Sequence, residues 1–264
     1  MLWQKIFLLP ARPGPSSPPW AVRILNAILV FLLLVFLFYF SFDQLNYHWR
    51  WRVVADNRQK FFQGWLLTVV ISLATLGLST GIGICFALGQ RARFLPLRYF
   101  SKIYVEVVRG TPLLVQILIF FYVVADAFHV SDRYLVGVLT LSFFSGAYIS
   151  EIVRAGIESV GQSQLESAKA IGLTHAQTYR YVIFPQALRQ TLPPLAGQFV
   201  SLIKDSSLLS IIGISELTWN ARDVNANTYS TLEAYIPLAA GYLILTLPIS
   251  IWTRWLEKKH QYET

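Results

Sequence analysis

The hydrophobic positions of this chain fall into six long apolar stretches separated by shorter polar ones. The stretches cover about residues 24–42, 64–88, 103–125, 134–155, 192–214 and 232–252. An α-helix needs roughly 20 predominantly apolar residues to cross the hydrocarbon core of a bilayer, and each stretch has about that length. The pattern therefore predicts an all-α membrane protein with six transmembrane helices.

The composition supports a membrane protein built as one integrated domain. Of the 264 residues, 55% are hydrophobic and only 14% are charged, and the mean hydropathy is +0.49. Soluble domains carry about a quarter of charged residues. The net charge of +8 does not indicate nucleic-acid binding, because Lys and Arg of membrane proteins gather in cytoplasmic loops. A single cysteine, Cys85, excludes an intrachain disulfide, and the four scattered histidines lack metal-ligand spacing.

The basic residues suggest an orientation, with one conflict. Four cations crowd the short loop after the second predicted span, which places that loop in the cytoplasm: Arg91, Arg93, Arg98 and Lys102. Six spans then place both termini in the cytoplasm as well. The loop 43–63 must lie on the other side, although it is also basic and contains Arg50, Arg52, Arg58 and Lys60. A re-entrant or interfacial segment there would reduce the conflict.

The longest polar segment on the predicted cytoplasmic side is residues 161–185, here called the knuckle. Ser163 followed three residues later by Glu166 is typical of a capping box, and so is Thr174 followed by Gln177. We therefore expect one helix over 164–171 and a second over 175–183.

Glycine and proline set the expected ends of these two helices. Gly172 takes the left-handed conformation that ends the first helix, and Pro185 ends the second because it has no N–H to donate. The residues alone leave two interpretations open. The knuckle is either a capped connection between spans or a docking surface for another protein.

Two predicted spans contain irregular features. Small residues recur every fourth position in the second span, at Gly77, Gly81, Cys85 and Gly89, which favours close helix packing. In the third span Glu106 and Arg109 share a helix face, and Gly110-Thr111-Pro112 follows at once, so we expect a bend or break there. This arrangement is either an interfacial ion pair beside a kink or a pivot at a gate. Glu151 and Arg154 repeat the charge pattern near the end of the fourth span.

The fifth predicted span contains Lys204-Asp205-Ser206-Ser207 near its middle. Charges at that depth cost about 2.5–3.5 kcal/mol each on insertion scales, and they usually face a cavity or a partner. Lys204 and Asp205 cannot both face one cavity, because adjacent helical residues point about 100° apart. Asp205 either pairs with a neighbouring helix or lines a pathway. Residues 215–231 are expected to form a long outer loop.

Signatures of enzymatic chemistry are missing. The chain has no G-x-x-x-x-G-K-[ST] phosphate loop, no H-E-x-x-H, no G-x-S-x-G and no Cys/His nucleophile pair. The intramembrane charges, the expected helix break and the knuckle favour transport. A secondary transporter would be expected to contain inverted repeats, and none is visible. A membrane-embedded enzyme would need a nucleophile or metal set that the sequence lacks.

Several motifs in one order resemble a known family. Glu166-Ser167-Ala168, Gly172 and then Val182-Ile183-Phe184-Pro185 resemble the EAA signature of permease subunits of ABC importers, with Ser167 in place of the usual second alanine. Residues 105–116, VEVVRGTPLLVQ, are similar to the hallmark of the polar amino acid permease subfamily, and residues 148–154 and 204–208 are similar to other stretches of it. The resemblance covers about residues 61–256.

The segments outside this resemblance are a proline-rich arm (1–22), an extra helix with its polar loop (23–60) and a tail (257–264). Within 61–256 the resemblance implies the fold of a type I ABC importer transmembrane subunit in a bacterial cytoplasmic membrane. It implies a second permease subunit, identical or a sister chain, two ATPase subunits and a solute-binding protein that delivers an amino acid. The chain itself would be no enzyme and bind no cofactor or metal, since ATP and Mg belong to the ATPase.

The resemblance also implies roles for particular residues. The knuckle would be the coupling helix that sits in a groove of the ATPase, through Glu166, Ser167, Ala168, Gly172, Leu173 and Pro185. A gate or pivot would comprise Glu106, Arg109, Gly110, Pro112, Glu151 and Arg154. A substrate pathway for a zwitterionic amino acid is hypothesised to include Ser145, Tyr148, Asp205, Ser206 and Ser207.

Overall fold

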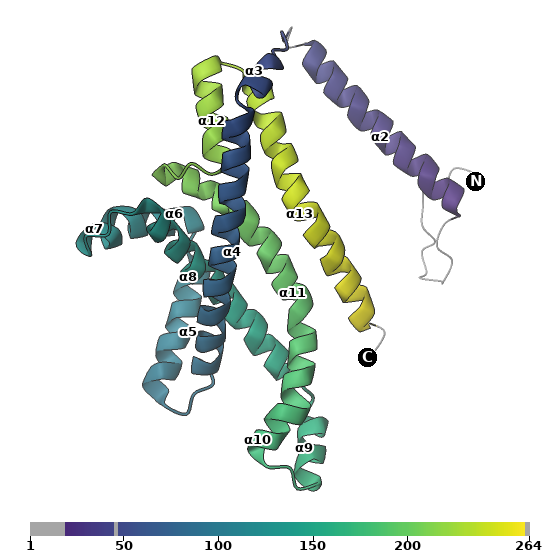
Figure 1. Cartoon of the computed structure of the whole chain (residues 1–264). Helices are drawn as coiled ribbons and strands as arrows, with labels where there is room; N and C mark the ends of the chain where they lie inside the picture. Colours follow the sequence, from purple (N-terminus) through teal and green to yellow (C-terminus); the bar gives the residue numbers. More distant parts are fainter. Residues whose placement is uncertain (1–18, 45–46, 262–264) are drawn as a thin grey trace. The chain divides into compact units, whose positions relative to one another are not determined.

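The computed structural model describes residues 19–44 and 47–261, and these are helical almost throughout and contain no strand. Two compact units divide the chain, residues 1–50 and 51–264. Most of the proline-rich arm predicted for 1–22 lies outside the described residues, as does the end of the tail. Figure 1 traces the elements from the N-terminus to the C-terminus.

The first unit contains one long helix, α2 (Trp20–Asp43), which confirms the apolar helix predicted for 24–42. Its mean hydropathy reaches 2.7 over 18 residues, and none of its residues is buried. A helix that is apolar all round belongs in a lipid or protein interior rather than in water.

The second unit carries the remaining elements. In chain order they are α3 (Arg52–Asp56), α4 (Arg58–Gly89), α5 (Leu95–Gly110), α6 (Leu113–Ile119), the π-helical η1 (Phe120–Val124), α7 (Ala125–Ala127), α8 (Arg133–Glu158), α9 (Gln162–Ala170), α10 (His175–Thr178), the π-helical η2 (Tyr179–Ile183), α11 (Phe184–Asp205), the 3₁₀-helical η3 (Ser206–Ile212), α12 (Leu217–Thr228) and α13 (Thr231–Gln261). Within residues 19–44 and 47–261, five helices or continuous helical runs, α2 among them, are long and apolar enough to cross a membrane, and the bent pair of α5 with α6–α7 makes six. The predicted number of apolar spans is confirmed when this pair counts as one.

Figure 1 shows the knuckle elements α9 and α10 at one end of this unit and α3 and α12 at the other. These are called the knuckle end and the α12 end. Two loops predicted near the α12 end are largely helical. The loop 43–63 contains α3 and the first turns of α4, and the loop 215–231 contains α12. The reason is packing, since Val53 and Val54 join an apolar cluster with Phe61, Leu217 and Val224.

A fully buried carboxylate begins α12. Glu216 accepts hydrogen bonds from the backbone N–H groups of Thr218 at 2.8 Å and Trp219 at 2.9 Å, and from the Tyr242 hydroxyl at 3.0 Å. Burial raises the pKa of the Glu216 carboxyl above its ordinary value of 4.5, although these three hydrogen bonds oppose the rise. The folded chain therefore holds this proton more tightly than the unfolded chain.

Acidification is expected to favour the folded state through Glu216. The contribution is complete below pH 4.5 and is lost as the pH rises through the raised pKa. Melting temperatures of the wild type and of Glu216→Gln, measured in detergent from about pH 7 to about pH 4.5, test this. The melting temperature of the wild type should rise relative to that of the variant as the pH falls. A difference that does not change with pH would contradict the prediction.

Small residues bring α4 and α8 into close contact. A Cβ atom on Gly83 would lie 2.5 Å from Cγ2 of Ile149 and 3.1 Å from the carbonyl oxygen of Gly146. Of the small-residue stripe predicted on α4, Gly89 packs against Ser101, whereas Gly77, Gly81 and Cys85 are exposed in this chain, so close packing at these three positions stays a prediction. The face of α4 that is buried is offset from the glycine repeat and carries Thr68, Ser72, Thr75, Ser79, Gly83 and Ala87.

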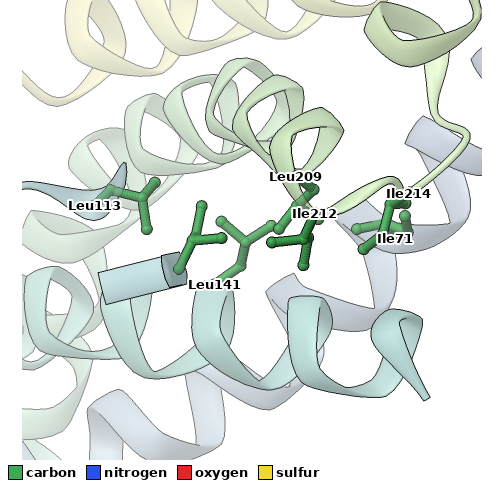
Figure 2. Packing of buried hydrophobic residues seen from close by; sticks show 7 residues of the cluster. Ile71, Leu113, Leu141, Leu209, Ile212 and Ile214 are labelled. Atoms are coloured by element: carbon green, nitrogen blue, oxygen red, sulfur yellow. The ribbon is translucent and has the colours of Figure 1, made fainter. Parts of the chain in front are cut away.

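The largest apolar cluster lies where two irregular points of the helices meet. Leu113 and Ile117 come from α6, just after the break in the third span, and Leu209 and Ile212 come from η3, just after Asp205. They pack with Ile71 of α4, Leu141 of α8 and Ile214. Figure 2 shows Leu209 and Ile212 facing Leu141, with Leu113 on the same side of the helix that carries Leu141. The segments after both irregular points therefore share one core.

Candidate functional site at the knuckle end

The first helix of the knuckle, α9, ends in a Schellman motif. The Gly172 N–H donates to the Lys169 carbonyl and the Leu173 N–H donates to the Ala168 carbonyl, both at 3.0 Å. Gly172 has φ of +79°, which confirms the predicted elbow. The second capping box is confirmed as well, because the Thr174 Oγ1 accepts from the Gln177 N–H at 3.3 Å and the Gln177 Oε1 accepts from the Thr174 N–H at 2.8 Å.

The first capping box is wrong. Gly161 is the N-cap of α9 and no side chain caps it, so Ser163 lies inside the helix. Glu166 instead accepts a hydrogen bond from the Gln162 Nε2 at 3.3 Å on the exposed surface. The helix begins two residues earlier than the Ser/Glu spacing suggested, because Gly161 rather than Ser163 takes the N-cap position and leaves the N–H groups of the first turn without a side-chain cap.

Pro185 does not end the second helix, which corrects another prediction. The chain continues from α10 through the π-helical turn η2 into α11, as one helical run over His175–Ile212. Pro185 falls in the first turn of α11, directly after this wider turn, where its missing N–H costs least. The second half of the knuckle is thus the beginning of a 38-residue helical run.

A small apolar cluster fixes the knuckle to the ends of α8 and α11. Val160, Ile183 and Ala187 are buried together, and Leu165 of α9 packs against them. Within the predicted coupling set, Ala168 is buried at 3% exposure, whereas Glu166, Ser167 and Gly172 are exposed. Leu173 is half-buried.

One apolar residue outside this predicted set is exposed next to it. Ile171 is 76% exposed at the tip of the elbow, where the sequence analysis assigned no role. Its signal was an apolar side chain directly before the glycine of a helix end in an otherwise polar segment.

A polar cavity of about 680 Å³ opens beside the knuckle. Charged and polar side chains from the end of α4, from α5, α8, α10 and η2 line it: Gln90, Arg91, Arg98, Lys102, Glu106, Glu151, Arg154, Glu158, His175 and Tyr179. The predicted gate residues Glu106 and Arg109 of α5 lie in different surroundings. Glu106 lines the cavity, and Arg109 reaches across to α8.

Glu151 is the centre of an ion-pair network. Its carboxylate accepts from the Arg154 Nε at 3.0 Å and Nη2 at 2.8 Å, lies 3.3 Å from the Arg109 Nη1, and accepts from the Gln90 Nε2 at 3.2 Å. Arg154 extends the network to Glu158 at 2.6 Å. The sequence suggested two separate pairs along single helices. The structure joins α4, α5 and α8 through one carboxylate.

The predicted break after Arg109 is confirmed. The chain bends by 110° between α5 and α6–α7, across Thr111 and Pro112, and Thr111 is extended as expected before a proline. Gln116 secures the break, because its Nε2 donates to the Val108 carbonyl at 2.7 Å and to the Thr111 Oγ1 at 2.7 Å. This amide therefore satisfies a carbonyl that the end of α5 leaves without a helical partner.

Gln116→Leu should destabilise the chain at this break. The substitution keeps the size of a buried side chain but leaves the Val108 and Thr111 acceptors without their donor, at a cost of about 1–3 kcal/mol. Thermal unfolding in mild detergent measures the effect. Gln59→Leu, at an exposed position of α4, is the matched control and should change the stability little. Equal melting temperatures for the wild type and Gln116→Leu would contradict the prediction.

The predicted pathway residues lie in three different settings. Asp205 ends α11 and is half-buried, Lys204 beside it is exposed, and the Ser206 hydroxyl donates to the Ile203 carbonyl at 2.8 Å as η3 begins. Lys204–Ser207 therefore stand at a change of helix type in the last third of the run His175–Ile212. Ser207 is half-buried.

The two pathway residues of α8 belong to other surroundings. Tyr148 lies beside the predicted gate residue Arg109, whose guanidinium is 5.4 Å from its ring centre. Ser145 is fully buried, and its hydroxyl has no hydrogen-bond partner among the described residues. Among residues 19–44 and 47–261, no group of three His, Cys, Asp or Glu side chains is arranged to hold a metal ion.

Comparison with known proteins now identifies the chain. Residues 79–262 match the family described as binding-protein-dependent transport system inner membrane component. The chain belongs to this family. It is also 34% identical over 207 residues to the probable glutamine ABC transporter permease protein GlnM of Bacillus subtilis, which covers 78% of this chain and 96% of the relative. The motif-based resemblance to ABC importer permeases is thereby confirmed.

Two further permease proteins are similar over about the same share of this chain. The glutamine transport system permease protein GlnP of Escherichia coli K12 is 35% identical over 79% of this chain and 96% of its own length. The L-cystine transport system permease protein TcyB of Bacillus subtilis is 37% identical over 79% of this chain and 90% of its own length.

Solved structures agree with the all-helical fold of an importer permease. The crystal structure of an amino acid ABC transporter with histidines superposes with a TM-score of 0.75 at 34% identity, covering 81% of this chain and all of that chain. The inward-facing MetNI methionine ABC transporter, at 15% identity, shares the fold with a TM-score of 0.59 over 76% of this chain and 94% of that chain.

Proposed function

We propose that this chain is the permease subunit of an importer that carries a polar amino acid into the cytoplasm, together with a separate ATPase and a solute-binding protein. The observation that carries the proposal is the knuckle, in which α9 ends at the Gly172 elbow and the capped helix α10 begins a 38-residue helical run. The names of relatives that are at least 34% identical, which mention glutamine and cystine, support an amino acid as the substrate.

In this mechanism the knuckle docks into the ATPase through its exposed residues, Glu166, Ser167 and Ile171. Closure of the ATPase around ATP draws the knuckles of two permease subunits together, and hydrolysis releases them. Because η2 joins α10 to α11, a displacement of α10 reaches Asp205 without crossing a loop. ATP and Mg are bound by the ATPase, and this chain supplies no ATP site.

The gate in this proposal is the network around Glu151. Arg109 is the last charged residue of α5 before the break, and Glu151 ties it to α8 at 3.3 Å. Gly110 and Pro112 bound the break itself. A movement of α5 away from α8 would separate Arg109 from Glu151. It would also widen the polar cavity of about 680 Å³ that Glu106 and Arg154 line. The knuckle, the cavity and both termini are then cytoplasmic.

Purification tests the assembly. The full chain, expressed with the ATPase and binding protein of the same transport system, should co-purify with the ATPase and, after reconstitution, support ATP-dependent uptake of a polar amino acid. Uptake that continues without any ATPase would contradict the proposal and favour a secondary transporter. A ligand screen on the binding protein then identifies the amino acid.

Asp205 is proposed to line the pathway, where its carboxylate attracts the α-ammonium group of the substrate. Asp205→Asn is expected to lower uptake and to raise the substrate concentration needed for half-maximal transport by about tenfold, since one such contact is worth about 1.4 kcal/mol. Lys204→Gln, at the exposed neighbouring position, is the matched control. Unchanged transport kinetics in Asp205→Asn would assign Asp205 a structural role.

A further inference from the structure

Four cations stand within 12 residues at the knuckle end, in the turn after α4 and the first half of α5: Arg91, Arg93, Arg98 and Lys102. Arg91 forms an ion pair with Glu158 at 3.5 Å. For the other three, the structure shows no ion pair within 4.0 Å among the described residues. They are exposed, so three positive charges within ten residues are available to a ligand.

Large apolar side chains stand among these cations. Phe94, Tyr99 and Phe100 are 67%, 61% and 62% exposed. Along α5 the charged residues 98, 102, 106 and 109 follow one face at helical spacing, and the apolar residues 99, 103 and 107 follow another. A helix of this kind, with cations on one face and exposed aromatic and aliphatic side chains on the other, is typical of the boundary between headgroups and acyl chains.

The packing places this helix at a membrane surface. Gly89, the last residue of the transmembrane helix α4, is in contact with Ser101 of α5. Lys102 and Arg98 line the same cavity as Glu158, the last residue of the transmembrane helix α8. The first turns of α5 therefore lie beside the ends of two apolar helices that cross the bilayer.

We propose that Arg93, Arg98 and Lys102 bind the phosphate of an anionic phospholipid headgroup, while Phe94, Tyr99 and Phe100 lie among the acyl chains of that lipid. An acidic protein partner would account for the cations, but it would not account for the exposed aromatic residues next to them. Free inorganic phosphate would leave the aromatic residues without a role. Clusters of Lys and Arg next to a transmembrane helix attract anionic lipids through the charge of the headgroups.

A lipid titration of the purified full chain tests this binding. The melting temperature in a neutral detergent is followed as dioleoylphosphatidylglycerol or the zwitterionic dioleoylphosphatidylcholine is added. Phosphatidylglycerol should raise the melting temperature of the wild type more than phosphatidylcholine does. In R93Q/R98Q/K102Q the amount of phosphatidylglycerol needed for half of the gain should rise at least about threefold. The control R52Q/R58Q/R222Q removes three exposed arginines at the α12 end and should behave as the wild type.

Several outcomes would overturn the inference. An equal loss in both triple variants would indicate general charge attraction, and an unchanged titration of R93Q/R98Q/K102Q would remove the site. Inorganic phosphate that stabilises the wild type as well as the lipid does would exclude the role of the acyl chains. Weaker ATPase retention with an unchanged lipid titration would assign the cations to the ATPase. If the triple variant does not fold, R93Q alone, in the exposed turn, should shift the titration in the same direction.

Discussion

Gly172→Val is expected to separate ATP hydrolysis from uptake. At φ of +79° a side chain costs roughly 1–2 kcal/mol, and a β-branched one costs more, so valine should distort the elbow that the Schellman motif holds. A Cβ atom there would meet nothing within 4 Å, so the effect comes from the backbone and not from a clash. Uptake by the reconstituted complex should fall roughly tenfold or more, equivalent to at least about 1.4 kcal/mol, while the chain remains inserted.

Two controls make the Gly172 experiment specific. Gly172→Asn should keep most of the uptake, because asparagine adopts the left-handed conformation more readily than other residues. Gly81→Val places the same side chain on α4 at a position that is equally open but has ordinary helical geometry, so it should leave coupling intact. Full ATP-driven uptake by Gly172→Val, in a complex that has assembled normally, would show that the elbow does not transmit movement.

Glu151→Gln should loosen the connection between α5 and α8. The amide is a poor partner for two guanidinium groups, so Arg109 and Arg154 lose their shared carboxylate. Side chains with exposures of 22–40% are only partly shielded from water, so the loss of stability should be about 1–2 kcal/mol, below the value for fully buried pairs. The complex should also hydrolyse ATP faster without substrate, since the proposed gate is weaker. Thermal unfolding and ATPase assays on the reconstituted complex measure both effects.

The same network supplies its own control. Glu158→Gln removes the carboxylate at the more exposed end, where pairs with Arg91 and Arg154 should contribute less than about 1 kcal/mol. A double-mutant cycle of Glu151→Gln with Arg109→Gln isolates the contact between α5 and α8. If the two substitutions act additively, Arg109 is not held by Glu151, and the gate requires another explanation.

Features that depend on local backbone chemistry could be predicted from the sequence. Gly172 ends a helix because of its own conformational freedom, Thr174 and Gln177 cap one another over three residues, and Pro112 breaks the third span at the expected place. The apolar stretches gave the number of spans for the same reason, because length and composition decide whether a helix crosses a bilayer.

Features that depend on contacts between helices could not be predicted. The partner of Arg109 is Glu151, 42 positions away in sequence, and not Glu106, which lies one turn away on its own helix. α12 was expected as a loop because its composition is polar, yet the buried cap of Glu216 and the packing of Leu217 hold it as a helix. Pro185 failed as a stop signal because a π-helical turn precedes it, and such a turn has no clear sequence signature.

The continuity of the knuckle with α11 has a geometric consequence. At a rise of 1.5 Å per residue, the run His175–Ile212 is roughly 57 Å long, so a tilt of about 5° at one end shifts the other by about 5 Å. Pro193 and Pro194 lie about halfway along it and weaken its backbone hydrogen bonds at that point. In the proposed mechanism the run acts as a lever arm with a joint at the two prolines, and replacing both with alanine is expected to stiffen it and to change how far Asp205 moves rather than the affinity for substrate.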